Sequence, residues 1–186
     1  MTTRTKDTAS PTIRFTAVPE VIGDTTVVRL PPEASAELPS RGQVAARVAL
    51  GDHPVDTVLE PDGRRGHWIR VDDGPGRAAG VKPGEAVEIT VEVVEDWPEP
   101  EVPQDLSDAL AAAPGKIQEI WDDITPMARW EWVRWLGATK NADTRRRRVE
   151  VSIDKLDHGK RRPCCFDLSS CTDPDVSRSG KLAEPS

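Results

Sequence analysis

The amino-acid sequence predicts an α+β fold, in which a small closed or nearly closed β-barrel precedes a unit of about four short helices. The first observation is a series of short segments rich in Val, Ile and Thr, separated by Gly, Pro and Asp, in the first half of the chain. The second is the acidic, proline-rich stretch EDWPEPEVP at 95–103, after which apolar residues recur with a helical period. The 186 residues suffice for one domain or two small ones with a buried core.

The barrel prediction depends on about six short strands. In the last of them Val87, Ile89 and Val91 alternate with polar residues, which is the pattern of a half-buried strand. Asp62-Gly63 lies in a turn, because glycine tolerates a positive φ. A closed sheet is favoured because closure removes exposed edges. The predicted strands are 12–18, 25–30, 42–50, 54–60, 67–71 and 85–94.

The second half predicts helices from apolar residues at i, i+3, i+4 and i+7. The first covers 106–113, the second 114–124, the third runs from Thr125-Pro126 to about Lys140, and the fourth from about Asp143 to His158. Thr125 and Asp143 are the expected N-caps, and Gly159 is the stop signal of the fourth helix. We therefore expect a barrel domain at 12–96, a linker at 97–103 and a helical module at 104–160.

Both ends of the chain are polar and lack periodicity. We expect 1–11 to be disordered and the cysteine-containing tail, 161–186, to be partly disordered. No segment approaches the roughly 18 apolar residues of a membrane span, and the N-terminal residues contain no apolar signal core. These features predict a cytoplasmic protein without a transmembrane segment, whose three cysteines are thiols.

The net charge of -7 is unevenly distributed. Residues 1–103 contain 11 basic and 18 acidic residues, whereas 140–162 contain nine basic and four acidic ones. An acidic chain disfavours general affinity for nucleic acid, while the local basic stretch leaves an anionic partner open.

Two sets of motifs resemble known families. The Leu-Pro before the Arg41-Gly42 step, the hairpin PDGRRGHWIRV and the strand KPGEAVEITVEV resemble the small β-barrel called domain of unknown function 1905. The motifs VPQDLSDAL, WVRWLGATK and TRRRRVEVSIDKLDHGKR are similar to the helical module of YdeI/OmpD-associated, bacteriocin-protection proteins. The resemblance extends over 12–165 and implies a link to envelope stress or to resistance against antimicrobial peptides, with no catalytic residues.

Two clusters are candidates for contact with a partner. Trp130, Trp132 and Trp135 crowd one helix, where they either pack in the core or form a partner-binding face. The basic stretch either forms ion pairs or binds an anionic partner (nucleic acid, lipid headgroup or acidic protein), because arginine donates in a planar fork. Its candidate anion-binding residues are Arg145, Arg146, Arg148, Lys160, Arg161 and Arg162. Successive helical residues diverge by about 100°, so these arginines cannot all face one ligand.

In the barrel, Arg41, His67 and Trp68 are candidates for lining a small ligand pocket at one mouth. No triad spacing, P-loop or dinucleotide motif accompanies them, so no enzyme and no cofactor are predicted. His158, Cys164, Cys165 and Cys171 are weak metal candidates, because their spacing lacks the C-x2-C pair of a zinc knuckle. The nearby basic residues would instead favour reactive thiols.

The sequence therefore predicts a noncatalytic binding or stress-protection protein, with an unknown small ligand or a protein as its partner. The alternatives are an anion- or nucleic-acid-binding module that uses the basic helix, and a thiol- or metal-dependent function of the C-terminal cysteines.

Overall fold

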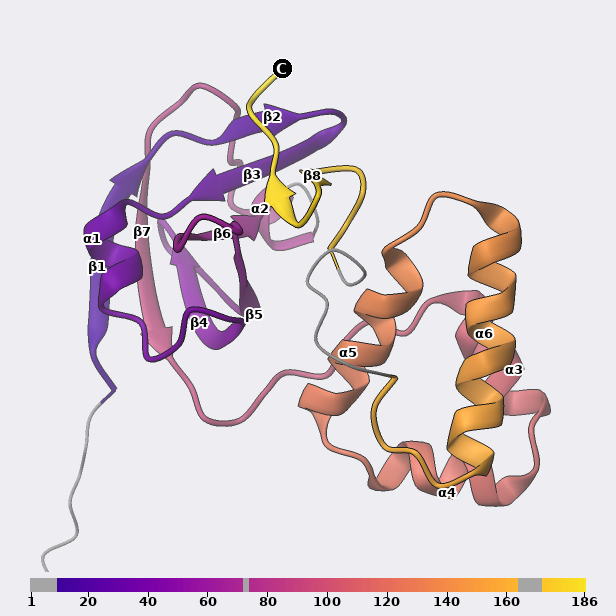
Figure 1. Ribbon diagram of the computed structural model, residues 1–186. Coiled ribbons are helices and arrows are strands. Elements are labelled where there is room, and N and C mark those ends of the chain that lie inside the picture. Colours follow the sequence, from indigo (N-terminus) through magenta and orange to yellow (C-terminus); the bar gives the residue numbers. More distant parts are fainter. Residues whose placement is uncertain (1–9, 72–73, 164–171) are drawn as a thin grey trace, which may run out of the picture. The chain divides into compact units, whose positions relative to one another are not determined.

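The N-terminal part is a curled antiparallel sheet that forms a half-barrel (Figure 1). The computed structural model describes residues 10–71, 74–163 and 172–186. The seven strands lie in the order β1-β7-β4-β5-β6-β3-β2. They are β1 (Thr12–Ala17), β2 (Glu20–Ile22), β3 (Thr25–Arg29), β4 (Val44–Leu50), β5 (His53–Pro61), β6 (His67–Arg70) and β7 (Val87–Val93). The α+β class and the barrel-type sheet are thus confirmed.

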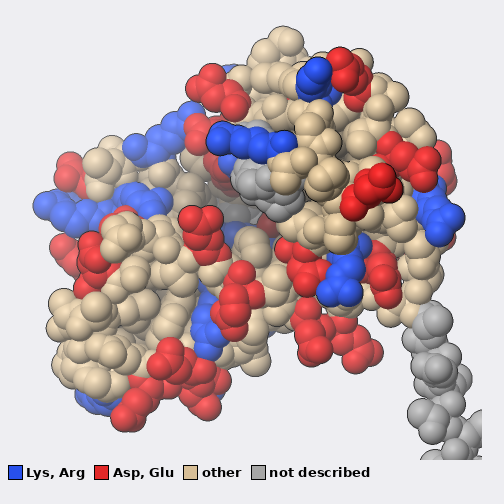
Figure 2. All heavy atoms as spheres, turned by 180° about the vertical axis from the view of Figure 1, so that it is seen from behind, with Lys and Arg blue, Asp and Glu red and all other residues tan. Residues whose placement is uncertain are grey.

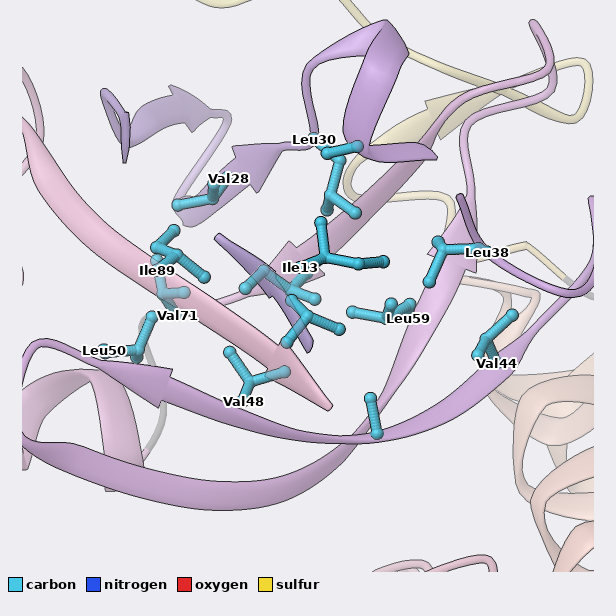
Figure 3. Close-up of a cluster of buried hydrophobic side chains, with 14 residues drawn as sticks. Ile13, Val28, Leu30, Leu38, Val44, Val48, Leu50, Leu59, Val71 and Ile89 are labelled. Atoms are coloured by element: carbon cyan, nitrogen blue, oxygen red, sulfur yellow. The ribbon is translucent and has the colours of Figure 1, made fainter. Parts of the chain in front are cut away.

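Alternating side chains of the strands fill the concave side of this sheet. Ile89 and Val91 of β7 are fully buried, whereas Glu88 and Glu92, which flank them, are exposed. Val48 of β4 pairs with Val91 in the antiparallel register. The buried side chains of several strands point toward one another in Figure 3. Burial of one face therefore fixes the register of the strands.

Three short elements of this part differ from the prediction. Strand β2 has three residues, too few to show an alternating pattern. Helix α1 (Pro32–Ala36) begins with proline in its first turn, where the missing N–H costs nothing. Helix α2 (Gly74–Ala78) lies in the segment GPGRAAG, for which the sequence predicts no helix. A Cβ atom at Gly76 would overlap the backbone carbonyl of Val71, so this close approach requires glycine.

The second part consists of helices α3 (Gln104–Ala112), α4 (Gly115–Asp123), α5 (Pro126–Gly137) and α6 (Ala142–Asp157). Thr125 caps α5 as predicted, because its side chain accepts a hydrogen bond from the Ala128 N–H. The N-cap of α6 is Asn141, whose side chain accepts a hydrogen bond from the Thr144 N–H. The prediction that Asp143 is the N-cap is therefore wrong.

One apolar cluster joins these four helices. Its most deeply buried members are Leu106, Ile117, Trp132, Leu136 and Leu156, each at most 2% exposed. They come from all four helices, and each lies on the apolar face that the helical period predicts.

The C-terminal residues form a small hairpin of β8 (Ser177–Arg178) and β9 (Lys181–Leu182). Val176 and Leu182 are fully buried, so this part of the tail is packed although its composition is polar. The contacts between residues divide the chain into two compact units. One unit consists of 97–186 together with the turns Val21–Thr25 and Asp62–Arg64.

Candidate functional site on helices α5 and α6

The three clustered tryptophans of α5 have different environments. Trp132 is fully buried, and its indole N–H donates to the Arg161 carbonyl at 3.3 Å. Trp130 is partly buried and donates to the Pro98 carbonyl at 2.7 Å. Trp132 is therefore a packing residue, which corrects its assignment to a partner-binding face, and the polar group of Trp130 is used within the chain.

Trp135 lies partly exposed between two cationic side chains of α6. The guanidinium carbon of Arg148 is 5.2 Å from the ring centroid, and Lys155 Nζ is 5.3 Å from it. Both distances are typical of cation–π contacts. The Trp132 ring meets Trp135 edge-on at 6.4 Å, which fixes the orientation of Trp135 from the core side. We call Trp135, Arg148 and Lys155 the Trp135 cluster.

The positions of the cluster follow from helix geometry. Arg148 and Lys155 are seven residues apart, two turns along the same face of α6. Each also donates to a backbone carbonyl: Arg148 to that of Trp135, and Lys155 to that of Pro163. Because those acceptors are neutral, and no carboxylate pairs with either side chain within the described residues, the two positive charges are not compensated there.

The other predicted anion-binding residues have carboxylate partners, with one exception. Arg145 donates to Asp105 at 2.6 Å and 3.0 Å in a bidentate pair that joins α6 to α3. The remaining pairs are Arg146 with Asp143, Arg161 with Asp123 and Arg162 with Glu131. Lys160 is exposed, and no ion pair of its side chain is found within the described residues.

The structure therefore does not bring the predicted cations together on one anion site. Along 140–162, the side chains of Arg147, Arg148, Lys155 and Lys160 are the ones without a carboxylate partner in the described part of the chain. Acidic and basic side chains are also interspersed on the face seen in Figure 2. Of these four cations, Arg147, Arg148 and Lys155 lie on α6, and Lys160 follows it.

Several carboxyl groups of this unit have a pKa outside their usual range, among them those of Asp105 and Glu131. The hydrogen bonds from Arg145 lower the pKa of Asp105, against the opposing effect of partial burial. Burial raises the pKa of Glu131, and the charges of Arg162 and Arg134 only partly oppose that effect. Neither group has a nucleophile as its partner, so these shifts belong to ion pairs and burial.

Lys155 was not identified from the sequence. It lies outside the dense run TRRRRVE, and the available signal was its spacing of seven residues from Arg148. The cluster can hold a carboxylate or phosphate group beside an aromatic surface, because two cations and the apolar ring meet there.

The candidates in the barrel lie close together but do not form an open mouth. Arg41 is exposed and donates to the Arg65 carbonyl at 3.0 Å. His67 is 1% exposed, with Nε2 3.0 Å from the Gly42 carbonyl, and Trp68 is 6% exposed. These contacts tie the segment around Gly42 to β6, so His67 and Trp68 are interior residues, which corrects the pocket-lining interpretation.

The metal interpretation depends largely on residues that the structure does not describe. Cys164, Cys165 and Cys171 lie outside the described residues, and their proposed role stays a prediction. His158 Nδ1 lies 2.8 Å from the backbone carbonyl of Asp154 at the end of α6. Within 10–71, 74–163 and 172–186, no three His, Cys, Asp or Glu residues form a group suited to a metal ion.

These features define a class of protein in which a curled antiparallel half-barrel precedes a helical module that carries an aromatic and cationic cluster. Comparison with family models then identifies both parts. Residues 15–91 match the domain of unknown function DUF1905, and residues 99–159 match the family described as bacteriocin-protection, YdeI or OmpD-associated. The resemblance to these two families that the sequence predicts is thus confirmed, in the same order along the chain.

The second match includes α3 to α6 in full and contains the Trp135 cluster. No curated protein matched the chain. No helix within the described residues is long and apolar enough to cross a membrane.

Proposed function

We propose that this protein is a noncatalytic binding protein that takes part in protection against bacteriocins or other antimicrobial peptides. The support is the match of 99–159 to a bacteriocin-protection family, since that match spans the whole helical module. In this proposal the module contacts its partner through the Trp135 cluster, and the half-barrel supplies a second folded part. The proposed location is the cytoplasm, which fractionation of cells that express the chain would test.

One observation carries the choice of this surface. Within the described residues, Arg148 and Lys155 bond neutral carbonyl groups and no carboxylate, while Arg145, Arg146 and Arg162 nearby are neutralised by carboxylates. A partly exposed indole with two uncompensated cations is suited to a partner that offers carboxylates beside an apolar group. Aromatic and arginine side chains are also the residue types that dominate binding energy at protein interfaces.

The partner we propose is therefore an acidic protein surface. The chain as a whole carries a net charge of -7, which repels a polyanion such as nucleic acid over a long range. A short acidic segment of a protein contacts only the local cationic surface, so this repulsion acts on it less strongly.

A second candidate, binding of nucleic acid, is favoured by the four cations in and just after α6 that have no carboxylate partner among the residues that the structure describes. Arg147 and Lys160 add to the charge of Arg148 and Lys155 in this candidate. Binding to an RNA or DNA oligonucleotide would weaken steeply with salt, and Arg148→Gln would reduce that slope. Absence of binding to oligonucleotides at low salt would eliminate this candidate.

The experiment for the leading proposal is a protection assay. A bacterium sensitive to a panel of bacteriocins and antimicrobial peptides is compared with and without expression of the chain. We expect the wild-type chain to raise the inhibitory concentration of at least one peptide, and Trp135→Ala or Arg148→Gln/Lys155→Gln to abolish that increase. Arg146→Gln is the matched control, since Arg146 is an exposed α6 arginine that is already paired with Asp143.

Two outcomes would contradict the proposal. If the wild-type chain gave no protection against any peptide of the panel, the protective role would be wrong. If protection were retained in the cluster variants but lost with Arg146→Gln, the assigned surface would be wrong. Counting free thiols and bound metal in the purified chain separately tests the alternative that the C-terminal cysteines carry the function.

A further inference from the structure

A second feature of the molecule lies beside the C-terminal hairpin and takes no part in the function proposed above. It is a pocket of about 640 Å³, a volume typical of sites for small molecules. Ile22, Val176 and Leu182, whose side chains are buried, contribute to its lining. All of its lining residues belong to one contact unit. Four lining residues are cationic: Arg64, Lys140, Arg178 and Lys181.

Backbone hydrogen bonds hold this hairpin in place. The Leu182 N–H donates to the Asp62 carbonyl at 3.0 Å, and the Ala183 N–H donates to the Val176 carbonyl at 2.8 Å. Gly63 has a φ of 73°, and a Cβ atom there would overlap the carbonyl of Gly180. The hairpin and the turn at Asp62–Arg64 are therefore in close backbone contact, so the pocket has a fixed frame.

Two like charges on the hairpin destabilise it. Arg178 and Lys181 are direct cross-strand partners that flank the turn at Ser179 and Gly180. Residues in such a pair project from the same face of a hairpin, and like charges placed there repel each other. Both residues line the pocket, and neither has an ion-pair partner in the part of the chain that is described. An anion between them would convert this repulsion into attraction.

The other cations of the pocket are paired, but through exposed contacts. Arg64 contacts Glu184 at 2.5 Å, with side chains 49% and 70% exposed, and Lys140 pairs with Asp175. Exposed pairs of this kind are weak and can exchange for another anion. Among the residues that line the pocket, four side chains are cationic and two are anionic, so the lining side chains carry an excess of positive charge.

We propose that this pocket binds a small anion that carries two or more phosphate or carboxylate groups. Arg178 and Lys181 hold one group between them, and Arg64 supplies a planar donor fork for a second. Glu184 limits the affinity, because its carboxylate competes for Arg64. The site uses none of the residues of the Trp135 cluster. The anion-binding proposal and the proposed function can therefore be refuted independently of each other.

The test is calorimetric titration of the full chain with pyrophosphate and with citrate, at a constant ionic strength of about 0.15 M. The two probes distinguish a phosphate site from a carboxylate site. The variants are Arg178→Gln/Lys181→Gln, Glu184→Gln, and Lys82→Gln as the matched control, because Lys82 is exposed and does not line the pocket. Circular dichroism of each variant verifies that it is folded.

We expect saturable binding of at least one probe, weakened about tenfold or more by the double substitution and changed less than about twofold by Lys82→Gln. Glu184→Gln should strengthen binding by about twofold or more, because it removes a repelling charge and frees Arg64. Absence of saturable binding of both probes would overturn the proposal, as would equal affinity of the wild type and the double variant. If the double variant did not fold, unchanged or weaker binding by Glu184→Gln would overturn it.

Discussion

Replacing Asp105 and Arg145 by alanine, singly and together, tests whether Arg145 stabilises the helical module instead of binding a ligand. The Arg145 Nε and Nη2 atoms donate to the two carboxylate oxygens of Asp105 at 2.6 Å and 3.0 Å. This bidentate pair joins α3 to α6 over 40 residues of sequence. Arg145 also donates to the Leu136 carbonyl at 3.4 Å, so one side chain connects α6 to two other helices.

The expected magnitude follows from geometry and exposure. Bidentate charge-assisted bonds are about twice as strong as neutral ones, but the two side chains are 32% and 40% exposed, which screens the pair. We therefore expect a coupling energy of about 1 kcal/mol, near the upper end for exposed pairs. Arg145→Ala alone should lower the free energy of unfolding by about 1–2 kcal/mol, because the Leu136 carbonyl also loses its donor.

The assay is urea unfolding followed by tryptophan fluorescence. Five of the six tryptophans lie at 97–135, so the signal reports chiefly on the helical module. The coupling energy is obtained from the double-mutant cycle, which cancels effects of each single change, such as the loss of the bond from the Leu106 N–H to Asp105. A coupling energy below about 0.2 kcal/mol would refute the structural role of this pair.

Acid provides an independent check of the same reasoning. The bonds from Arg145 lower the pKa of Asp105 in the folded state. The stabilisation is therefore complete above the unfolded-state pKa of about 3.9, and it is lost as the pH falls from there through the lower folded-state pKa. Coupling that stayed constant as the pH fell through this range would contradict the assignment.

Three further predictions concern packing and charge. Trp132→Ala should lower the free energy of unfolding by about 3–5 kcal/mol, measured by urea unfolding, because it empties a fully buried site; a cost below about 1 kcal/mol would contradict that burial. Gly63→Ala should speed tryptic cleavage after Arg178, because the new Cβ atom overlaps the Gly180 carbonyl; unchanged cleavage would refute this contact. Glu131→Gln should raise the free energy of unfolding relative to the wild type as the pH rises from about 4.3 through the raised folded-state pKa of Glu131. The reason is that the partly buried carboxylate ionises over this range in the wild type and is absent from the variant. A pH-independent difference in urea unfolding would contradict it.

The regular elements with a long apolar pattern were predictable from the sequence. Strand β7 alternates apolar and polar residues over its seven positions, and α5 begins with the cap Thr125 followed by proline. Strand β2 is too short for a period to be recognised. The C-terminal hairpin has a Ser179-Gly180 turn, but the two-residue strands beside it are too short to alternate.

The site was predictable only in its residue types. Trp135 and Arg148 could be identified as candidates because aromatic and basic residues are dense there. Their pairing could not, because Arg145 and Arg148 are three residues apart and yet one meets Asp105 while the other lies over Trp135. Which cation is neutralised depends on contacts between helices, and these are set by the packing of the apolar cluster rather than by local spacing.

The most direct test of the central claim is the inhibitory concentration of a bacteriocin or antimicrobial peptide panel for cells that express the chain. We predict that the wild-type chain and the Arg146→Gln variant raise the inhibitory concentration of the same peptide, and that the Arg148→Gln/Lys155→Gln variant, expressed at the same level and folded, does not. Equal protection by all three chains, or protection by none of them, would contradict the claim.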